Sequence, residues 1–279
     1  MANYQNKFDS VIIRSRALLL RLPMKIRLTP RIFLFLSAFS LVFWLIRTAD
    51  HGKMLLVDLQ DLGGIPWLYS AICLIFSILA AFTIQKEWEH WDDLVTAIKG
   101  ELDTIRELWK WSQHLAGGSR DDISNCLENY LTALLADWPE TRRADGRSAG
   151  ENVLDVLRRT IVELPSGTGR TQQLALFEEL IRNRDKRTDQ SISHIPQVLK
   201  NTLIFTDILV IVLSLFIGVR NPFIDYLFTV SIAALSYTIY IVIDDLDNPF
   251  RPGSWHLTSF EHHLLLDKIR LGRDTKAFD

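Results

Sequence analysis

IPWLYSAICLIFSILAAFTI, at residues 65–84, contains no charged side chain. The hydrocarbon core of a bilayer is about 30 Å thick, so about 20 helical residues rising 1.5 Å each will cross it. This stretch is therefore long enough and apolar enough to form one transmembrane helix. Charge returns directly after it, at Lys86 and Glu87, where a helix leaving the bilayer meets water.

Three further apolar runs accompany this stretch. Residues 32–46 lie between Arg31 and Arg47, residues 203–219 are apolar except for Asp207, and residues 222–243 are apolar except for Asp225. The break between the last two runs is too short for anything but a tight helical hairpin. We therefore predict an all-α membrane protein with four transmembrane helices, two plus two, and a helical cytoplasmic domain between the pairs.

The overall composition hides a strong segregation of charge. The chain has 279 residues, of which 48% are hydrophobic, and its formal net charge is −2. No long basic stripe is present, so the sequence gives no support for nucleic-acid binding. Cys73 and Cys126 lie in different segments without CxxC or metal-ligand spacing, which favours plain packing roles.

The placement of lysine and arginine predicts the orientation. Seven basic residues precede the first apolar run and are opposed only by Asp9, which is typical of a segment that stays in the cytoplasm. Both termini are then cytoplasmic. We expect a basic amphipathic segment at 1–30, transmembrane helices at 31–85, a cytoplasmic helical domain at 86–198, transmembrane helices at 199–244 and a cytoplasmic tail at 245–279.

The second span is predicted to continue as a helix into the cytoplasmic domain. Apolar residues recur there at alternating gaps of three and four, the 3.5-residue seam of a helix packed along other helices. The seam consists of Trp88, Trp91, Val95, Ile98, Leu102, Ile105 and Trp109. Charged residues between them, including Glu101, are assigned to a solvated outer face. A basic cluster precedes the third span and is either positive-inside flanking charge or an anion-attracting vestibule. It consists of Arg182, Arg184, Lys186 and Arg187.

Asp207 is the main candidate for an intramembrane functional residue, because ionisable groups are costly inside a bilayer. The alternative is a structural ion pair with Lys200 or a neighbouring arginine. His256, Glu261, His262 and His263 lack the spacing of a metal site. No catalytic triad, carboxylate pair or phosphate loop is recognisable, so we expect neither an enzyme nor a cofactor.

Two motifs resemble those of the bestrophins, pentameric anion channels, and of the related bestrophin-like membrane proteins. Residues 86–94 (KEWEHWDDL) follow the second span with a basic residue, tryptophans and a leucine in similar array. The second motif follows the last span and consists of Leu246, Asp247, Asn248, Pro249 and Phe250. The resemblance implies a homo-oligomer, possible contact with inorganic anions such as chloride, and residence in a bacterial inner membrane.

The resemblance also implies a position for the channel constriction. Aligning residues 86–94 brings the apolar neck of bestrophins onto Ser70, Leu74 and Ile78, which share one helix face. Leucine and isoleucine suit a dewetting constriction, whereas serine does not. The alternative is that this stripe is a helix-packing surface. Arg251 and the residues after it replace the acidic run that binds calcium in animal bestrophins, so no calcium site is expected.

Two functions therefore remain open from the sequence. The leading hypothesis is an oligomeric anion channel with an apolar constriction on the second span. The rival is a non-conducting membrane scaffold or sensor, whose cytoplasmic helical domain binds a partner.

Overall fold

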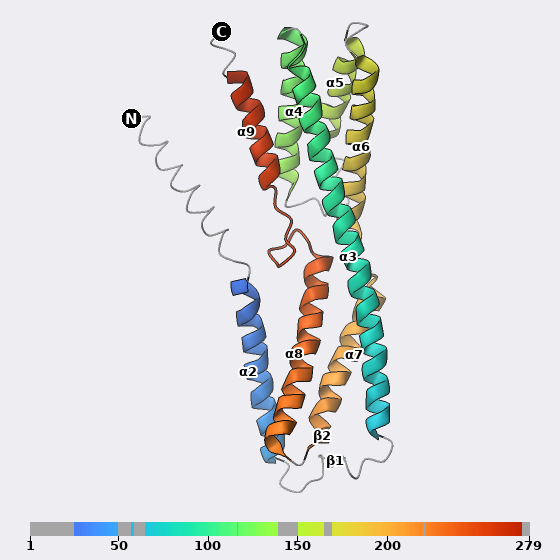
Figure 1. Cartoon of the computed structure of the whole chain (residues 1–279), viewed down its shortest axis with the longest axis vertical. Helices are drawn as coiled ribbons and strands as arrows, with labels where there is room; N and C mark the ends of the chain where they lie inside the picture. Colours follow the sequence, from blue (N-terminus) through green and yellow to red (C-terminus); the bar gives the residue numbers. More distant parts are fainter. Residues whose placement is uncertain are drawn as a thin grey trace, which may run out of the picture. The chain divides into compact units, whose positions relative to one another are not determined.

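The computed structural model describes residues 25–49, 57–58, 65–115, 117–138, 150–164, 169–219 and 221–274, and these residues are helical almost throughout (Figure 1). The predicted all-α class is therefore confirmed. Most of the predicted amphipathic segment at 1–30 lies outside the described residues. The elements are α2 (Lys25–Ala49), β1 (Val57–Asp58), α3 (Ile65–Ser112), α4 (Gly117–Asp137), α5 (Gly150–Glu163), α6 (Arg170–Ile192), α7 (Gln197–Phe216), β2 (Ile217–Gly218), α8 (Pro222–Asp247) and α9 (Phe260–Asp274).

Four helices in the described part of the chain are long and apolar enough to cross a membrane, as predicted. The qualifying segments are Pro30–Ala49, Trp67–Ser112, Gln197–Phe216 and Pro222–Asp247. The first is longer than the run of residues 32–46 seen in the sequence, because the helix continues through Arg31 and Arg47 instead of ending at them. The second belongs to α3, a single helix of 48 residues, so the predicted continuation of this span beyond the apolar run is confirmed.

The chain divides into two compact units. The first, here called the span unit, comprises Met1–Gln85 and Ile195–His256. The second, here called the bundle unit, comprises Lys86–His194 and Leu257–Asp279. Helix α3 contributes to both, with its apolar half in the span unit and its charged half in the bundle unit.

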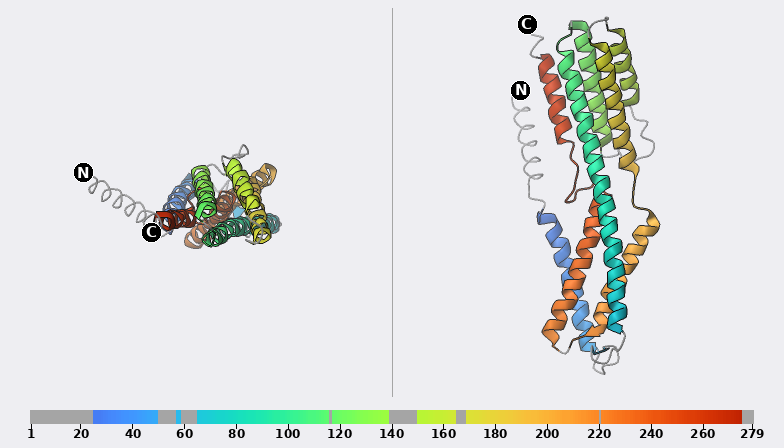
Figure 2. Two further views of the ribbon diagram at one scale, coloured as in Figure 1. Left: turned by 90° about the horizontal axis from the view of Figure 1, so that it is seen from above. Right: turned by 45° about the vertical axis from the view of Figure 1, so that its right-hand side comes forward.

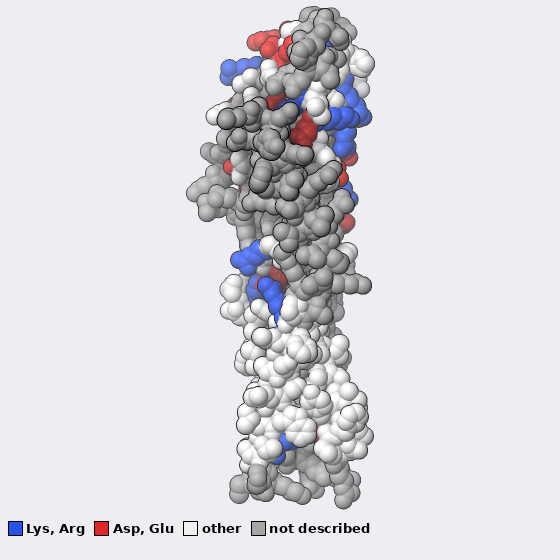
Figure 3. Space-filling view, turned by 90° about the vertical axis from the view of Figure 1, so that its left-hand side faces the viewer, with Lys and Arg blue, Asp and Glu red and all other residues white. Residues whose placement is uncertain are grey.

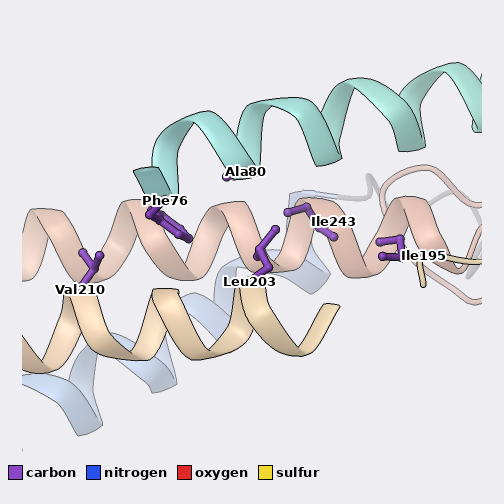
Figure 4. Close-up of a cluster of buried hydrophobic side chains, with 6 residues drawn as sticks. All are labelled: Phe76, Ala80, Ile195, Leu203, Val210 and Ile243. Atoms are coloured by element: carbon purple, nitrogen blue, oxygen red, sulfur yellow. The ribbon is translucent and has the colours of Figure 1, made fainter. Parts of the chain in front are cut away.

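Apolar side chains between α3, α7 and α8 form the main core of the span unit (Figure 4). A second cluster joins α2 to α7 and α8 through Phe39, Phe43, Leu215 and Ala233. On the face drawn in Figure 3, the described surface of the span unit is largely uncharged, with charged groups near its two ends. Large apolar side chains such as Phe33, Phe82 and Phe228 are more than 60% exposed, which suits a surface solvated by hydrocarbon.

The bundle unit is built from the charged half of α3 together with α4, α5, α6 and α9, as the two views in Figure 2 display. Helix α4 lies against both α5 and α9, and α5 lies against α6. Helix α9 was not anticipated from the sequence, which assigned residues 245–279 only to a tail. Its buried residues are Leu265, Leu266 and Ile269, together with His262.

The predicted seam on α3 is partly wrong. Leu102 and Ile105 are buried as expected, but Trp88 is 44% exposed. The face that α3 buries in the bundle unit is rotated by about one residue from the prediction, because a seam counted from apolar residues alone overlooks the buried polar ones. The buried side chains of this half of α3 are Glu87, Leu94, Ala97, Glu101, Leu102, Thr104, Ile105, Leu108 and Ser112.

Candidate functional site

The stripe of Ser70, Leu74 and Ile78 lies on an open face of α3. Leu74 is 61% exposed and Ile78 is 49% exposed, and Ser70 is also exposed. The opposite side of the same helix is buried, with Phe76 at 5% and Ala80 at 2%. Among the described helices of this chain, Leu74 and Ile78 therefore do not belong to the surface by which α3 packs. The stripe is available to lipid, to a second copy or to an aqueous path.

Asp207 lies halfway along α7, not near its end as expected from the apolar run, because α7 begins at Gln197. Its side chain is buried and interacts with the hydroxyl of Ser236 on α8. Its Oδ1 has no hydrogen-bond partner among the described residues. The expected ion pair with Lys200 is absent, since Lys200 Nζ lies 2.9 Å from Asp247 Oδ2 and 3.5 Å from Asp244 Oδ1.

The motif after the last span links α8 to the start of α7. The buried carboxylate of Asp247 accepts a hydrogen bond from the backbone N–H of Ile195 (3.2 Å) and another from Lys200 Nζ (2.9 Å). Asn248 donates to the Asp244 carbonyl oxygen at 2.9 Å. Asp247 thus joins the end of α8 to the start of α7, which gives its motif a structural role in the span unit.

The turn that follows is tightly packed. Pro249 is buried and Phe250 is half-buried. Asp245 Oδ2 accepts a hydrogen bond from the Ser254 N–H at 2.9 Å, and a Cβ atom at Gly253 would stand only 2.8 Å from Asp245 Oδ1. Any larger residue at position 253 would therefore have to displace this carboxylate and its hydrogen bond to Ser254.

A buried ion pair ties α2 to α8 at the other end of the span unit. Arg47 Nη2 lies 2.7 Å from Asp225 Oδ2 and also donates to the Ile217 carbonyl oxygen at 3.2 Å. The guanidinium stacks over the ring of Phe43 at 5.0 Å. Asp225 additionally accepts from the Val219 N–H at 3.1 Å. Arg47 is therefore the counter-charge of Asp225 at this end of the span unit.

Glu101 is fully buried, contrary to its predicted place on a solvated face. Arg187 Nε lies 2.6 Å from Glu101 Oε2, and Arg187 Nη2 lies 3.4 Å from Oε1. The Tyr130 hydroxyl donates to Glu101 Oε1 at 2.5 Å. Burial and the charge of Glu101 raise the pKa of Tyr130 well above its ordinary value. Burial lowers the pKa of Arg187, but the charges and hydrogen bonds of Glu101 and Tyr130 together outweigh burial and raise it.

Arg187 therefore does not belong to an exposed basic cluster. Arg182 and Lys186 are exposed, whereas Arg184 is partly buried and lies 3.7 Å from Asp185. Sequence reasoning also missed the pairing of Arg47 with Asp225, although the two residues sit at corresponding ends of the first and last spans and carry opposite charges. The pairing of Glu101 with Arg187 left no such signal, because nothing in the sequence places these two residues at matching positions on their helices.

These features define an integral membrane protein with four apolar helices and a helical bundle unit. The model of the Bestrophin-like domain family matches residues 33–253. The chain belongs to this bestrophin-like family, as its motifs suggested. A search of curated proteins finds no match.

Solved structures with the same fold come from a bacterial bestrophin homologue of Klebsiella pneumoniae. One point-mutant structure has a TM-score of 0.71 at 13% identity, covering 87% of this chain and 98% of its own. A second mutant gives 0.70 at 15% identity, covering 86% and 99%. A structure phased with zinc gives 0.68 at 14% identity, covering 85% and 95%. At these identities the likeness establishes the fold.

Proposed function

We propose that this chain forms a homo-oligomeric anion channel in which α3 of each copy faces a common axis. The observation that carries the proposal is the open face of α3, where Leu74 and Ile78 stay exposed while Phe76 and Ala80 are buried. Membership of the bestrophin-like family supports the same reading. Five copies are the number implied by the resemblance to bestrophins.

In this arrangement Leu74 and Ile78 form apolar rings that constrict the path. Apolar rings of this kind gate by excluding water, and their effect depends on side-chain size. Ser70 lies one turn away from Leu74 on the same face and forms a wider, polar ring. Since residues 65–85 contain no charged side chain, selectivity among ions does not come from charged rings on this part of α3.

Exposed basic side chains offer a source of anion preference elsewhere. Arg182 and Lys186 on α6 remain exposed in the bundle unit. We infer from the placement of lysine and arginine that the bundle unit and both termini are cytoplasmic, in a bacterial inner membrane. In sealed vesicles whose cytoplasmic face lies inside, protease added from outside should then leave residues 139–149 uncut. Cleavage there would overturn this orientation.

Recording from purified protein in planar bilayers tests the channel proposal. Leu74→Ala and Ile78→Ala shorten the apolar rings and are expected to raise single-channel conductance or open probability. Ser70→Leu adds an apolar ring and is expected to lower both. Native mass measurement on the same preparation reports the number of copies.

Leu68→Ala is the matched control. Leu68 lies on the same helix and is 66% exposed. It is six residues away from Leu74, which separates the two side chains by about 120° around the helix axis. It should leave the current unchanged. An intact oligomer that is electrically silent in every variant would refute the channel and favour a non-conducting scaffold.

A further inference from the structure

Helix α9 is held on the bundle unit by contacts of several kinds. Its own side chains Leu265, Leu266 and Ile269 are buried. Arg270 Nε lies 2.8 Å from Glu128 Oε1 on α4, and Lys268 Nζ lies 5.4 Å from the centre of the Trp109 ring. Helix α9 follows residue 253, where the match to the family model ends.

One polar residue lies in this otherwise apolar contact. His262 is 1% exposed, and its ring lies 4.9 Å from the ring of Trp138, which ends the α4 segment. Neither of its ring nitrogens has a hydrogen-bond partner in the described part of the chain. A buried imidazole without partners is stable only when neutral, because the protonated form would lose its hydration without gaining a hydrogen bond.

The charges around His262 do not favour its protonation. Glu101 on α3 is the one nearby anion among the groups that influence it, and Arg187 on α6 already neutralises that carboxylate. On α4, Tyr130 donates its hydroxyl to the same carboxylate and Trp138 contributes only its ring. On α9 itself, His263 adds a further positive charge when protonated.

We propose that α9 is a pH-dependent latch: it remains docked while His262 is neutral and is released when acidification protonates this imidazole. Release would uncover the part of α4 that α9 covers, including the ring of Trp138. The latch is a property of the bundle unit and does not depend on ion conduction.

The pH range follows from the burial of His262. Burial lowers the pKa of His262 from 6.5 to about 4; Glu101 opposes this shift, and Arg187 and His263 add to it. Undocked α9 therefore binds a proton more readily than docked α9. Docking is strongest above pH 6.5 and is lost progressively as the pH falls from 6.5 toward 4. Linkage between these two values weakens docking about fourfold at pH 6 and about thirtyfold at pH 5.

Hydrogen exchange followed by mass spectrometry on the full-length protein in lipid nanodiscs tests this proposal. Exchange of the α9 amides is compared at pH 7.5 and pH 5.0 after correction for the intrinsic chemical rate. The expected result is a loss of α9 protection by about thirtyfold at pH 5.0. Helix α5 serves as the internal reference, because its sequence contains no histidine.

Two variants distinguish the effect of His262 from that of its neighbour His263. His262→Phe keeps an aromatic ring but removes the titration, so α9 protection should no longer change over this pH range. His263→Phe alters the exposed residue next to it and removes only the smallest contribution to the pKa of His262, so α9 protection should still be lost on acidification. If His262→Phe fails to dock at pH 7.5, His262→Leu takes its place.

Three results would overturn the latch. The first is unchanged α9 protection in wild type at pH 5.0. The second is an equal loss of α9 protection at pH 5.0 in wild type and in a variant that docks α9 but has no imidazole at residue 262. The third is simultaneous loss of protection in α5, which would mean that acid unfolds the whole unit. If neither variant docks, the titration of wild type and His263→Phe decides: a midpoint outside the range between pH 4 and 6.5 refutes the proposal.

Discussion

Replacing Glu101 by glutamine should destabilise the bundle unit more than any other single charge removal on α3. The substitution keeps the side-chain shape but leaves Arg187 buried without a counter-charge. The Arg187 side chain is 7% exposed and that of Glu101 is 0% exposed, so water cannot take over the lost interaction. Removing one partner of a buried ion pair typically costs about 3–5 kcal/mol.

The geometry supports a cost in this range. Arg187 donates two hydrogen bonds to Glu101, at 2.6 Å and 3.4 Å, and hydrogen bonds to charged groups contribute about 1.5–3 kcal/mol each. Tyr130 can still donate to the amide oxygen of glutamine, which keeps the loss from exceeding that range. At about 1.4 kcal/mol per factor of ten, protection from hydrogen exchange across α3 and α6 should fall by roughly two to four powers of ten.

Glu107→Gln on the same helix is the control. Glu107 lies 2.7 Å from Lys110, but both side chains are more than half exposed, and such surface pairs contribute about 0–1 kcal/mol. The double variant Glu101→Gln with Arg187→Met removes both buried charges and should recover part of the lost stability. Equal effects of Glu101→Gln and Glu107→Gln would refute the argument that the buried pair organises the bundle unit.

Two further predictions concern close packing and the span unit. Gly100→Ala should leave the bundle unit no more stable in the same exchange assay, because the new Cβ would stand 2.8 Å from Asn183 Nδ2, and displacing that amide offsets the gain of about 1 kcal/mol that alanine brings to a helix. Gly118→Ala, with no atom within 4 Å of its Cβ, should instead stabilise α4 by up to about 1 kcal/mol. Asp247→Ala should cost about 1–3 kcal/mol by leaving the buried N–H of Ile195 without its acceptor, measured as a lower midpoint of thermal aggregation in detergent.

The transmembrane helices were predictable because a bilayer imposes a length and excludes charge, and both properties are local in sequence. The same reasoning predicted the continuity of α3, since its apolar half leads without a turn signal into a charged helical half. The length of the first span was underestimated for a related reason. Flanking arginines mark where a helix meets polar surroundings, but Arg31 and Arg47 lie within α2 and do not end it.

The partners of Glu101 and Lys200 were not predictable, because each comes from another helix with nothing in the sequence to align the two residues. A charged residue between apolar seam positions is normally solvated, so Glu101 was assigned to the outside. Its burial depends on Arg187, which arrives from α6. Likewise the alternative considered for Asp207 was an ion pair with Lys200, seven residues earlier on the same helix, or with a neighbouring arginine, whereas Lys200 binds Asp247 from the end of α8. Helix periodicity alone cannot decide whether a lysine pairs with a carboxylate on its own helix or with a carboxylate on a different helix.

The ion pairs of the span unit also suggest which helix is free to move. Arg47 and Asp225 join α2 to α8, and Lys200 and Asp247 join α7 to α8. Residues 65–85 of α3 contain no charge, so this helix is held in the span unit by apolar contacts such as those of Phe76. Apolar contacts are non-directional, so the half of α3 at residues 65–85 shifts against α7 and α8 without breaking an ion pair of the span unit, while Glu101 and Arg187 hold its other half in the bundle unit. A channel with its constriction on residues 65–85 would therefore change its aperture through this segment while α2, α7 and α8 keep their pairing.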